Sequence, residues 1–347
     1  MSQTFFLSNS DFDRFLTSLS LSYQVYVPIQ KDKHRFYKKF TPSEPVTVGE
    51  VRAFEPLKAF FTRAREKVAH NFDEAVPHPQ HKPIAIVGAK ACDLKGFKIQ
   101  DYVFSGRDGK DVPDPLYVSN RRENLIISSD CTCAIETCFC MALGLMPHPQ
   151  EGFDINFSNV ENGFLVESAS PKGQSIIEKN SSLFKQASKE HFNQRERLRS
   201  KTASQVMENL KVNDIPHQDR FEGIIAKNFE SEIWKEEAKT CVECGCCTII
   251  CPTCHCFLLY DQKDEASMER LRVWDSCMIK DYARVAGGGN PRAQLWKRLR
   301  NRFEKKFDFF PKVAQVYACT GCGRCITGCP AKIDIRRVLR KLVNSHV

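Results

Sequence analysis

Cysteine is the residue type whose number and spacing in this chain point most directly to chemistry. The 347-residue sequence contains 17 cysteines, and seven of them fall within the stretch CVECGCCTIICPTCHC, residues 241–256. An odd number of cysteines cannot be fully paired, and in a reduced compartment such thiols bind metal more often than they form disulfides. The chain is therefore expected to hold metal through cysteine.

One cysteine motif occurs twice, with an offset of 78 residues: C-x2-C-x2-C-x3-C-P begins at Cys241 and again at Cys319. This spacing is typical of two-cluster ferredoxins, in which the fourth cysteine of each run binds the cluster of the other run. The motif predicts two 4Fe–4S clusters, one bound by Cys241, Cys244, Cys247 and Cys329, the other by Cys319, Cys322, Cys325 and Cys251. Structural zinc is the alternative, but zinc sites seldom consist of two identical four-cysteine runs closed by proline.

The first half of the chain alternates stretches typical of strands and helices. Apolar runs at 23–29, 83–88 and 124–129 predict strands, and residues 92–104, between the last two, predict a helix. A hairpin is expected next, with FDINF and GFLVES as its strands. This order predicts an α/β layer with some parallel pairing.

The second half is expected to be mainly helical. A long amphipathic helix is predicted within 183–210 and further helix within 220–240, and little after the first cysteine run is typical of strand. We therefore predict an α/β domain over residues 1–205 and a mainly α-helical ferredoxin-type domain with two 4Fe–4S clusters over residues 206–347.

Nine cysteines lie outside the repeated motif, and five of them follow predicted strands. Cys92 comes directly after the 83–88 strand, and Cys131, Cys133, Cys138 and Cys140 come after the 124–129 strand. If these strands are parallel, both groups emerge at the same edge of the sheet, where α/β proteins place ligand sites. A third cluster is therefore expected at this edge, with buried or reactive thiols as the alternative.

Several stretches resemble a known family of dicluster subunits. WKEEAKTCVECGCCTIICPTCHCF, RVWDSC, AGGGNPR, RLRNRFEKKF and ACTGCGRCITGCPAKIDI are similar to the group that contains the anaerobic sulfite reductase A subunit and the sulfhydrogenase beta subunit. GAKACDLKGF and TCFCMALGLMP resemble upstream cysteine motifs of that family. The resemblance implies an electron-transfer subunit between a partner that binds FAD and NAD(P) and a catalytic subunit of the sulfite or sulfur reductase, hydrogenase or heterodisulfide-reductase type.

The same resemblance bears on the cysteines outside the repeat. It implies that the third cluster is bound by Cys92, Cys131, Cys138 and Cys140, with Cys133 as a departure from the family pattern. Cys254, Cys256 and Cys277 also match family positions, and either a fourth metal site or packing beside the main clusters would account for them. Cys246 replaces a small residue that is not a ligand, so a packing role is expected.

Charge and hydropathy limit the choice of partners. The formal net charge is +9, but each 4Fe–4S cluster with four thiolates adds about −2, so three clusters would offset much of it. In the basic segment 292–307, Leu295, Leu299 and Phe303 share a helical face, and we expect the cations to lie on a solvated face opposite it. Docking to an acidic partner is the alternative, and nucleic-acid binding is not expected.

The N-terminus lacks the basic and continuous apolar regions of a secretory signal, and no apolar run approaches the ~18 residues of a membrane span. We therefore expect a cytoplasmic protein without membrane insertion. No glycine-rich nucleotide motif occurs, so NAD(P) or flavin is assigned to another subunit. The leading hypothesis is a relay without catalytic residues. The alternative is an oxidoreductase with its own substrate site, at an incompletely ligated cluster or at a flavin in the N-terminal domain.

Overall fold

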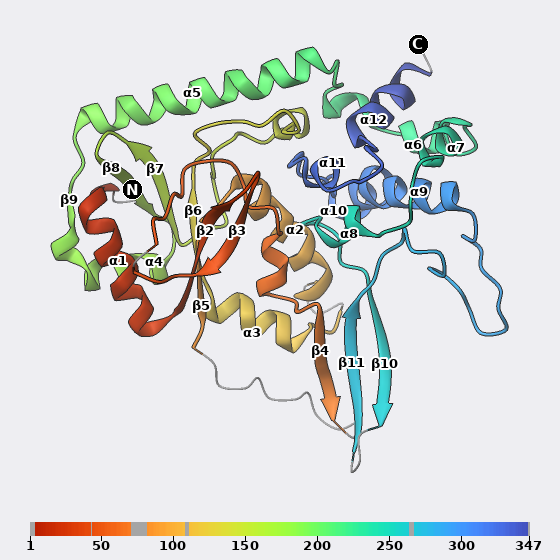
Figure 1. Ribbon diagram of the computed structural model, residues 1–347, viewed down its shortest axis with the longest axis horizontal. Coiled ribbons are helices and arrows are strands. Elements are labelled where there is room, and N and C mark those ends of the chain that lie inside the picture. Colours follow the sequence, from red (N-terminus) through yellow and green to blue (C-terminus); the bar gives the residue numbers. More distant parts are fainter. Residues whose placement is uncertain (1–3, 43, 71–81, 108–110, 264–266, 346–347) are drawn as a thin grey trace.

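The computed structural model describes residues 4–42, 44–70, 82–107, 111–263 and 267–345. It consists of a sheet region (residues 4–188) and a dicluster region (residues 213–345), between which helix α5 (Lys189–Val212) passes along one side of the molecule (Figure 1). The domain boundary predicted between residues 205 and 206 falls inside this helix.

The sheet region is built on eight strands in the order β3-β2-β5-β6-β7-β8-β1-β9. β2, β5, β6 and β7 are parallel neighbours, and the remaining pairs are antiparallel. The predicted strands, helix and β7–β8 hairpin are all present, whereas the first strand and helix were not predicted. The strands are β1 (Thr4–Ser8), β2 (Gln24–Lys31), β3 (His34–Lys39), β5 (Ile84–Ala89), β6 (Leu125–Ser129), β7 (Ile155–Val160), β8 (Gly163–Ser168) and β9 (Phe184–Gln186).

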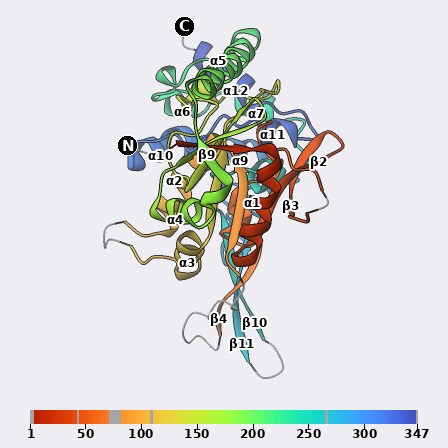
Figure 2. The same ribbon diagram turned by 90° about the vertical axis from the view of Figure 1, so that its left-hand side faces the viewer.

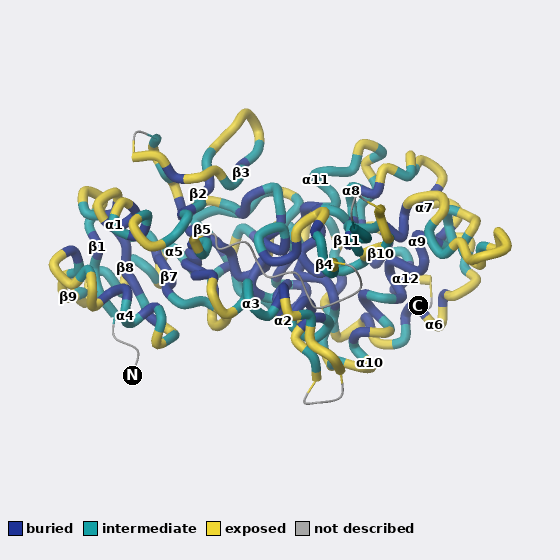
Figure 3. The backbone as a smooth tube through the Cα atoms, turned by 90° about the horizontal axis from the view of Figure 1, so that it is seen from below, coloured by how far each residue is buried: buried dark blue, intermediate teal, exposed yellow. Residues whose placement is uncertain are grey.

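Helices cover both faces of this sheet, because the central strands are apolar on both sides. On one face, Val87 and Ile127 pack against α1 (Asn9–Ser22) and α4 (Pro171–Lys179). On the other face, Ile86 and Ile126 pack against α2 (Ala91–Phe104) and α3 (Pro115–Glu123). The strand ends that lead to the cysteines are thus fixed from both sides, and the buried backbone lies mainly in the interior of the molecule (Figure 3). Short 3-10 helices lie at Leu57–Phe60, Cys140–Leu143, Ser181–Leu183 and Gln218–Arg220.

The dicluster region packs short helices around one apolar core, in which Trp234 and Phe303 are almost fully buried. Its helices are α6 (Ile224–Lys227), α7 (Ile233–Ala238), α8 (Cys246–Ile249), α9 (Leu295–Glu304), α10 (Phe310–Ala314), α11 (Arg324–Thr327) and α12 (Ile335–Asn344), with a π-helical turn at Lys305–Phe309.

A hairpin projects from the dicluster region (Figure 2). It consists of β10 (Phe257–Lys263) and β11 (Met268–Trp274), and β4 (Arg65–His70) from the sheet region joins it as a third strand. The prediction of little strand after the first cysteine run missed this hairpin. β10 is mostly exposed, so it lacks the alternation of apolar and polar residues that marks a half-buried strand.

The two regions meet along a buried seam beside the cysteines. Gly321 lies so close to the sheet region that a Cβ atom would stand 2.5 Å from Cα of Cys140. Across the same seam Arg324 donates to Asp93 at 2.6 Å, and both side chains are completely buried. The cysteines of the two regions are therefore held in one packed unit.

Candidate iron–sulfur sites

The two cysteine runs fold into matching loops. Glu243 and Gly321, at equivalent positions, both have positive φ, and their backbone N–H groups donate to the first thiol of each run, Cys241 and Cys319. In both loops a glycine in the left-handed region then starts a single helical turn, α8 or α11. N–H groups directed at sulfur are a feature by which proteins stabilise anionic iron–sulfur clusters.

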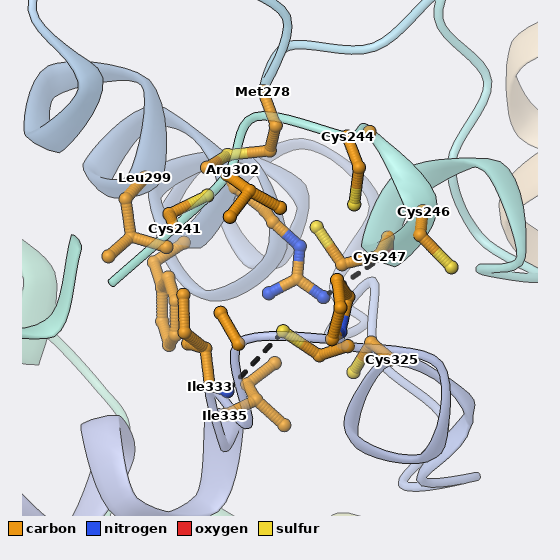
Figure 4. A pocket seen from close by; sticks show the side chains of 16 residues that line it. Cys241, Cys244, Cys246, Cys247, Met278, Leu299, Arg302, Cys325, Ile333 and Ile335 are labelled. Atoms are coloured by element: carbon orange, nitrogen blue, oxygen red, sulfur yellow. Dashed lines mark hydrogen bonds between the residues drawn. The ribbon is translucent and has the colours of Figure 1, made fainter. Parts of the chain in front are cut away.

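The first predicted ligand set surrounds one cavity of about 530 Å³, part of which is open to solvent. All four predicted ligands line it (Cys241, Cys244, Cys247 and Cys329), and we call it the Cys241 site. Ile333 N–H donates to Cys329 Sγ at 3.3 Å. Figure 4 shows Arg302 reaching into the middle of this cavity, while the Cys246 sulfur points away from it.

The second predicted ligand set also comes together, and we call it the Cys251 site (Cys319, Cys322, Cys325 and Cys251). Burial is the main cause that raises the pKa of Cys319, to about 12, and the nearby Cys325 and Cys251 thiols act in the same direction. Cys322 and Cys251 likewise raise the pKa of Cys325, after burial. Cys251 Sγ also lies 3.3 Å from Lys306 Nζ.

The structure also brings together the cysteines of the sheet region, at the edge where β5 and β6 end. Cys92 at the start of α2 and the loop cysteines Cys131, Cys133, Cys138 and Cys140 line one cavity of about 390 Å³, which we call the Cys92 site. Arg52 and Pro147 also line this cavity.

Cys131 and Cys133 both line the cavity of the Cys92 site, but they act on different thiols. Cys131 is close enough to Cys92 and Cys140 to raise the pKa of each, although burial is the larger cause in both cases. Cys133, for its part, raises the pKa of Cys131 and of Cys138, again with burial as the larger cause.

The three sites form a series with the Cys251 site in the middle. Cys325, a member of that site, also lines the cavity of the Cys241 site. Cys322, another member, also lines the cavity of the Cys92 site. Each outer site is therefore in direct contact with the central one.

The thiols fit clusters better than single metal ions. Burial raises the pKa of Cys247 and of Cys131 to about 12, so without metal these thiols would be protonated at neutral pH, whereas coordination deprotonates a thiol outright. Within the described ranges, no three His, Cys, Asp or Glu side chains converge as ligands of one ion. Zinc needs such convergence at about 2.3 Å, while a cubane spreads four thiolates over four irons.

The remaining cysteines lie beside the predicted ligands or beside one another. Cys254 hydrogen-bonds to the Cys251 thiol, which together with Lys306 lowers the pKa of Cys251. Cys256 lies beside Cys277 instead and is 3.7 Å from Lys305 Nζ. The Cys246 sulfur lies 3.0 Å from the position that a Cβ on Gly328 would take.

The prediction that the cations of the basic segment 292–307 lie on a solvated face is wrong for three of them. Leu299 and Phe303 are buried as predicted, but Arg298, Arg302 and Lys306 are buried as well, with 1%, 5% and 3% of their surface exposed. These cations recur at i, i+4 and i+8, directly beside the apolar stripe. That periodicity was the signal in the sequence, and it was missed because basic residues are rarely buried unless they are paired.

The comparisons with known proteins agree with this geometry. Residues 240–333 match the family model of a 4Fe-4S dicluster domain. Over 337 residues the chain is 30% identical to sulfhydrogenase 2 subunit beta of Pyrococcus furiosus, and the match covers 96% of each chain. The chain belongs to the sulfhydrogenase beta-subunit family. The resemblance inferred from the cysteine motifs is thereby confirmed.

The match to sulfhydrogenase 2 subunit beta spans both regions of the chain, whereas the dicluster model covers only the cysteine runs and what lies between them. Iron–sulfur clusters are thus indicated for this member of the sulfhydrogenase beta-subunit family, and the sheet region is part of the family architecture. Among the residues that the structure describes, no helix is long and apolar enough to cross a membrane.

Proposed function

We propose that this chain is the iron–sulfur electron-transfer subunit of a cytoplasmic multisubunit oxidoreductase and holds three 4Fe–4S clusters in series. When bound, the clusters supply one-electron transfer. The observation that carries this proposal is the double role of the Cys251 site. Cys325 reaches the cavity of the Cys241 site and Cys322 reaches that of the Cys92 site, so neighbouring sites share a wall.

The chain's own residues hold and insulate the three sites. The predicted ligands are the eight cysteines of the two runs together with Cys92, Cys131, Cys138 and Cys140. Backbone N–H groups such as that of Ile333 donate to sulfur, and buried cations offset the negative charge. These contacts stabilise anionic clusters and set their potentials.

The outer sites differ in their access to solvent, which bears on where partners dock. Cys244 of the Cys241 site is exposed, whereas Cys92 and Cys140 of the Cys92 site are buried. We therefore assign the Cys241 site to contact with one redox partner. The relative's name makes it one subunit of a sulfhydrogenase. From the resemblance of the cysteine motifs, the partners we propose are a subunit that binds flavin and NAD(P) and a catalytic redox subunit.

The test is anaerobic reconstitution of the full chain. We expect about 12 Fe per chain, from three clusters of four, and bleaching of the visible absorbance by dithionite. We also expect the isolated chain neither to bind flavin nor to oxidise NAD(P)H. A content of about 8 Fe per chain would contradict the third cluster. Oxidation of NAD(P)H by a flavin bound to the isolated chain would contradict the role as an electron relay.

A further inference from the structure

Among the buried cations beside the ferredoxin cysteines, two come from the basic segment 292–307 and have no carboxylate partner. Arg302 Nη2 donates to the carbonyl of Cys247 at 3.4 Å, and Arg302 lines the cavity that also includes Cys325. Lys306 Nζ lies 3.3 Å from Cys251 Sγ and donates to Thr253 Oγ1 at 2.8 Å. Neither cation has a carboxylate oxygen within 4.0 Å anywhere in the described part of the chain.

Two other arginines on α9, in contrast, have carboxylate partners. Arg298 pairs with Glu243 at 2.5 Å, and Arg300 lies 3.4 Å from Glu230. A buried charge without a counter-ion is strongly destabilising, so Arg302 and Lys306 require an anion where the thiols converge. Arg302 Nε also has no hydrogen-bond partner among the residues that the structure describes. Anionic clusters at the Cys241 and Cys251 sites would meet this requirement.

We propose that Arg302 is a potential-setting residue shared by the Cys241 and Cys251 sites, whereas Lys306 acts on the Cys251 site alone. This inference rests on the proposed function, since it presupposes that both sites hold clusters. A nearby positive charge stabilises the reduced cluster, which carries one more negative charge, and so raises its reduction potential. Because it receives both cations, the Cys251 site is the more readily reduced of the two.

The shared role of Arg302 follows from its position. It lies between Cys247 and Cys325, which belong to different sites, and both thiols raise its pKa against the opposing effect of burial. Burial acts to lower the pKa of Lys306, but Cys251, Cys254 and Cys319, none of which belongs to the Cys241 site, raise it. Lys306 lies in the π-helical turn Lys305–Phe309, which follows α9.

The experiment is a redox titration of the full chain, monitored by EPR, for the wild type and four variants. In Arg302→Gln, the equilibrium constant for reduction should fall about tenfold or more at two of the three centres, where each tenfold change corresponds to 59 mV for a one-electron couple. In Lys306→Gln the equilibrium constant for reduction should fall at one centre only. That centre should be one of the two that change in Arg302→Gln. In Arg302→Lys, which keeps the charge, the equilibrium constants for reduction should stay within about threefold of the wild-type values.

Arg300→Gln is the matched control, because Arg300 is a largely buried arginine on the same helix that donates to the carbonyl of Phe229 instead of facing a cysteine. It should leave all centres unchanged. Unchanged potentials in Arg302→Gln, or an equal fall in Arg302→Lys, would overturn the proposal. If Arg302→Gln loses iron, Arg302→Lys and Lys306→Gln decide by the same criteria. The iron content of the wild type tests the proposed function separately.

Discussion

The dicluster region and the sheet region gather cysteines in different ways. In the dicluster region, two loops of one repeated sequence each bring three cysteines together, and Gly245 and Gly323 shape both loops identically, with φ of 71°. In the sheet region, Cys92 and the loop from Cys131 to Cys140 come from separate strand ends. The first arrangement is local in sequence, whereas the second exists only once the sheet has formed.

The difference matters at the seam, where the dicluster region also closes the Cys92 site. Gly321 and Cys322 line that site's cavity, and the N–H of Phe139 donates to the carbonyl of Gly321 at 2.9 Å. The sheet-region site therefore depends on the dicluster region for part of its wall. Substitutions at the seam and at the predicted ligands should show whether the Cys92 site depends on the dicluster region as well as on its own cysteines.

The largest effect is expected from removing ligands in either region. Cys247→Ala and Cys92→Ala should each lower the iron content by about four of about 12 atoms, because each cluster loses one thiolate. The matched controls are Cys246→Ala and Cys133→Ala, neighbouring thiols that should keep all the iron. Iron and acid-labile sulfide analysis measures both outcomes. Iron loss from Cys133→Ala and its retention in Cys92→Ala would reassign the site.

Breaking the buried ion pair at the seam should have the next largest effect. Asp93→Asn leaves Arg324 charged and unpaired where neither side chain is exposed, which should lower the free energy of unfolding by about 3–5 kcal/mol in anaerobic urea titrations. Asp261→Asn, in the partly exposed pair with Arg270, should cost much less, because solvent screens this pair. Equal effects of the two substitutions would mean that the seam pair is not a specific link.

A smaller effect is expected from adding one methyl group at the seam. Gly321→Ala combines a positive φ with contacts of 2.5 and 2.6 Å to the backbone of Cys140, so it should destabilise the chain by roughly 1–3 kcal/mol and alter the EPR signal of the Cys92 site. Gly287→Ala has the same kind of φ but meets nothing within 4 Å. It should destabilise the chain less and leave every EPR signal unchanged, and a comparable spectral change in this control would refute the seam argument.

The smallest effect is expected at the cysteines that belong to neither arrangement. Cys256→Ala and Cys277→Ala should keep about 12 Fe per chain, because the structure places Cys254 with Cys251 and leaves only two thiols beside Lys305. A loss of about four iron atoms in either variant would instead establish a fourth cluster. The iron analysis used for the ligand variants decides this point.

The contrast between local and tertiary assembly explains what the sequence allowed us to predict. The strands before Cys92 and Cys131 were predictable from their apolar runs, and their parallel pairing then placed both cysteines at one edge. The sheet of β4, β10 and β11 was not predictable from the sequence, because β4 pairs with β11 across some 200 residues. β4 also carries charged side chains such as Arg65 and Glu66.

The inward cations show a second limit of the sequence. Periodicity identified the apolar stripe of Leu299 and Phe303, but a basic residue is normally expected on the solvated side of such a helix. Arg302 and Lys306 are buried because the thiols of two cysteine loops converge on them, and that convergence is a property of the fold.

The most direct test of the serial arrangement is the EPR spectrum of the fully reduced wild-type chain. If the Cys251 site lies between the other two and shares a wall with each, the spectrum should integrate to about three spins per chain and show broadening from magnetic interaction between neighbouring clusters. Two spins, or three sharp signals without interaction, would contradict the series.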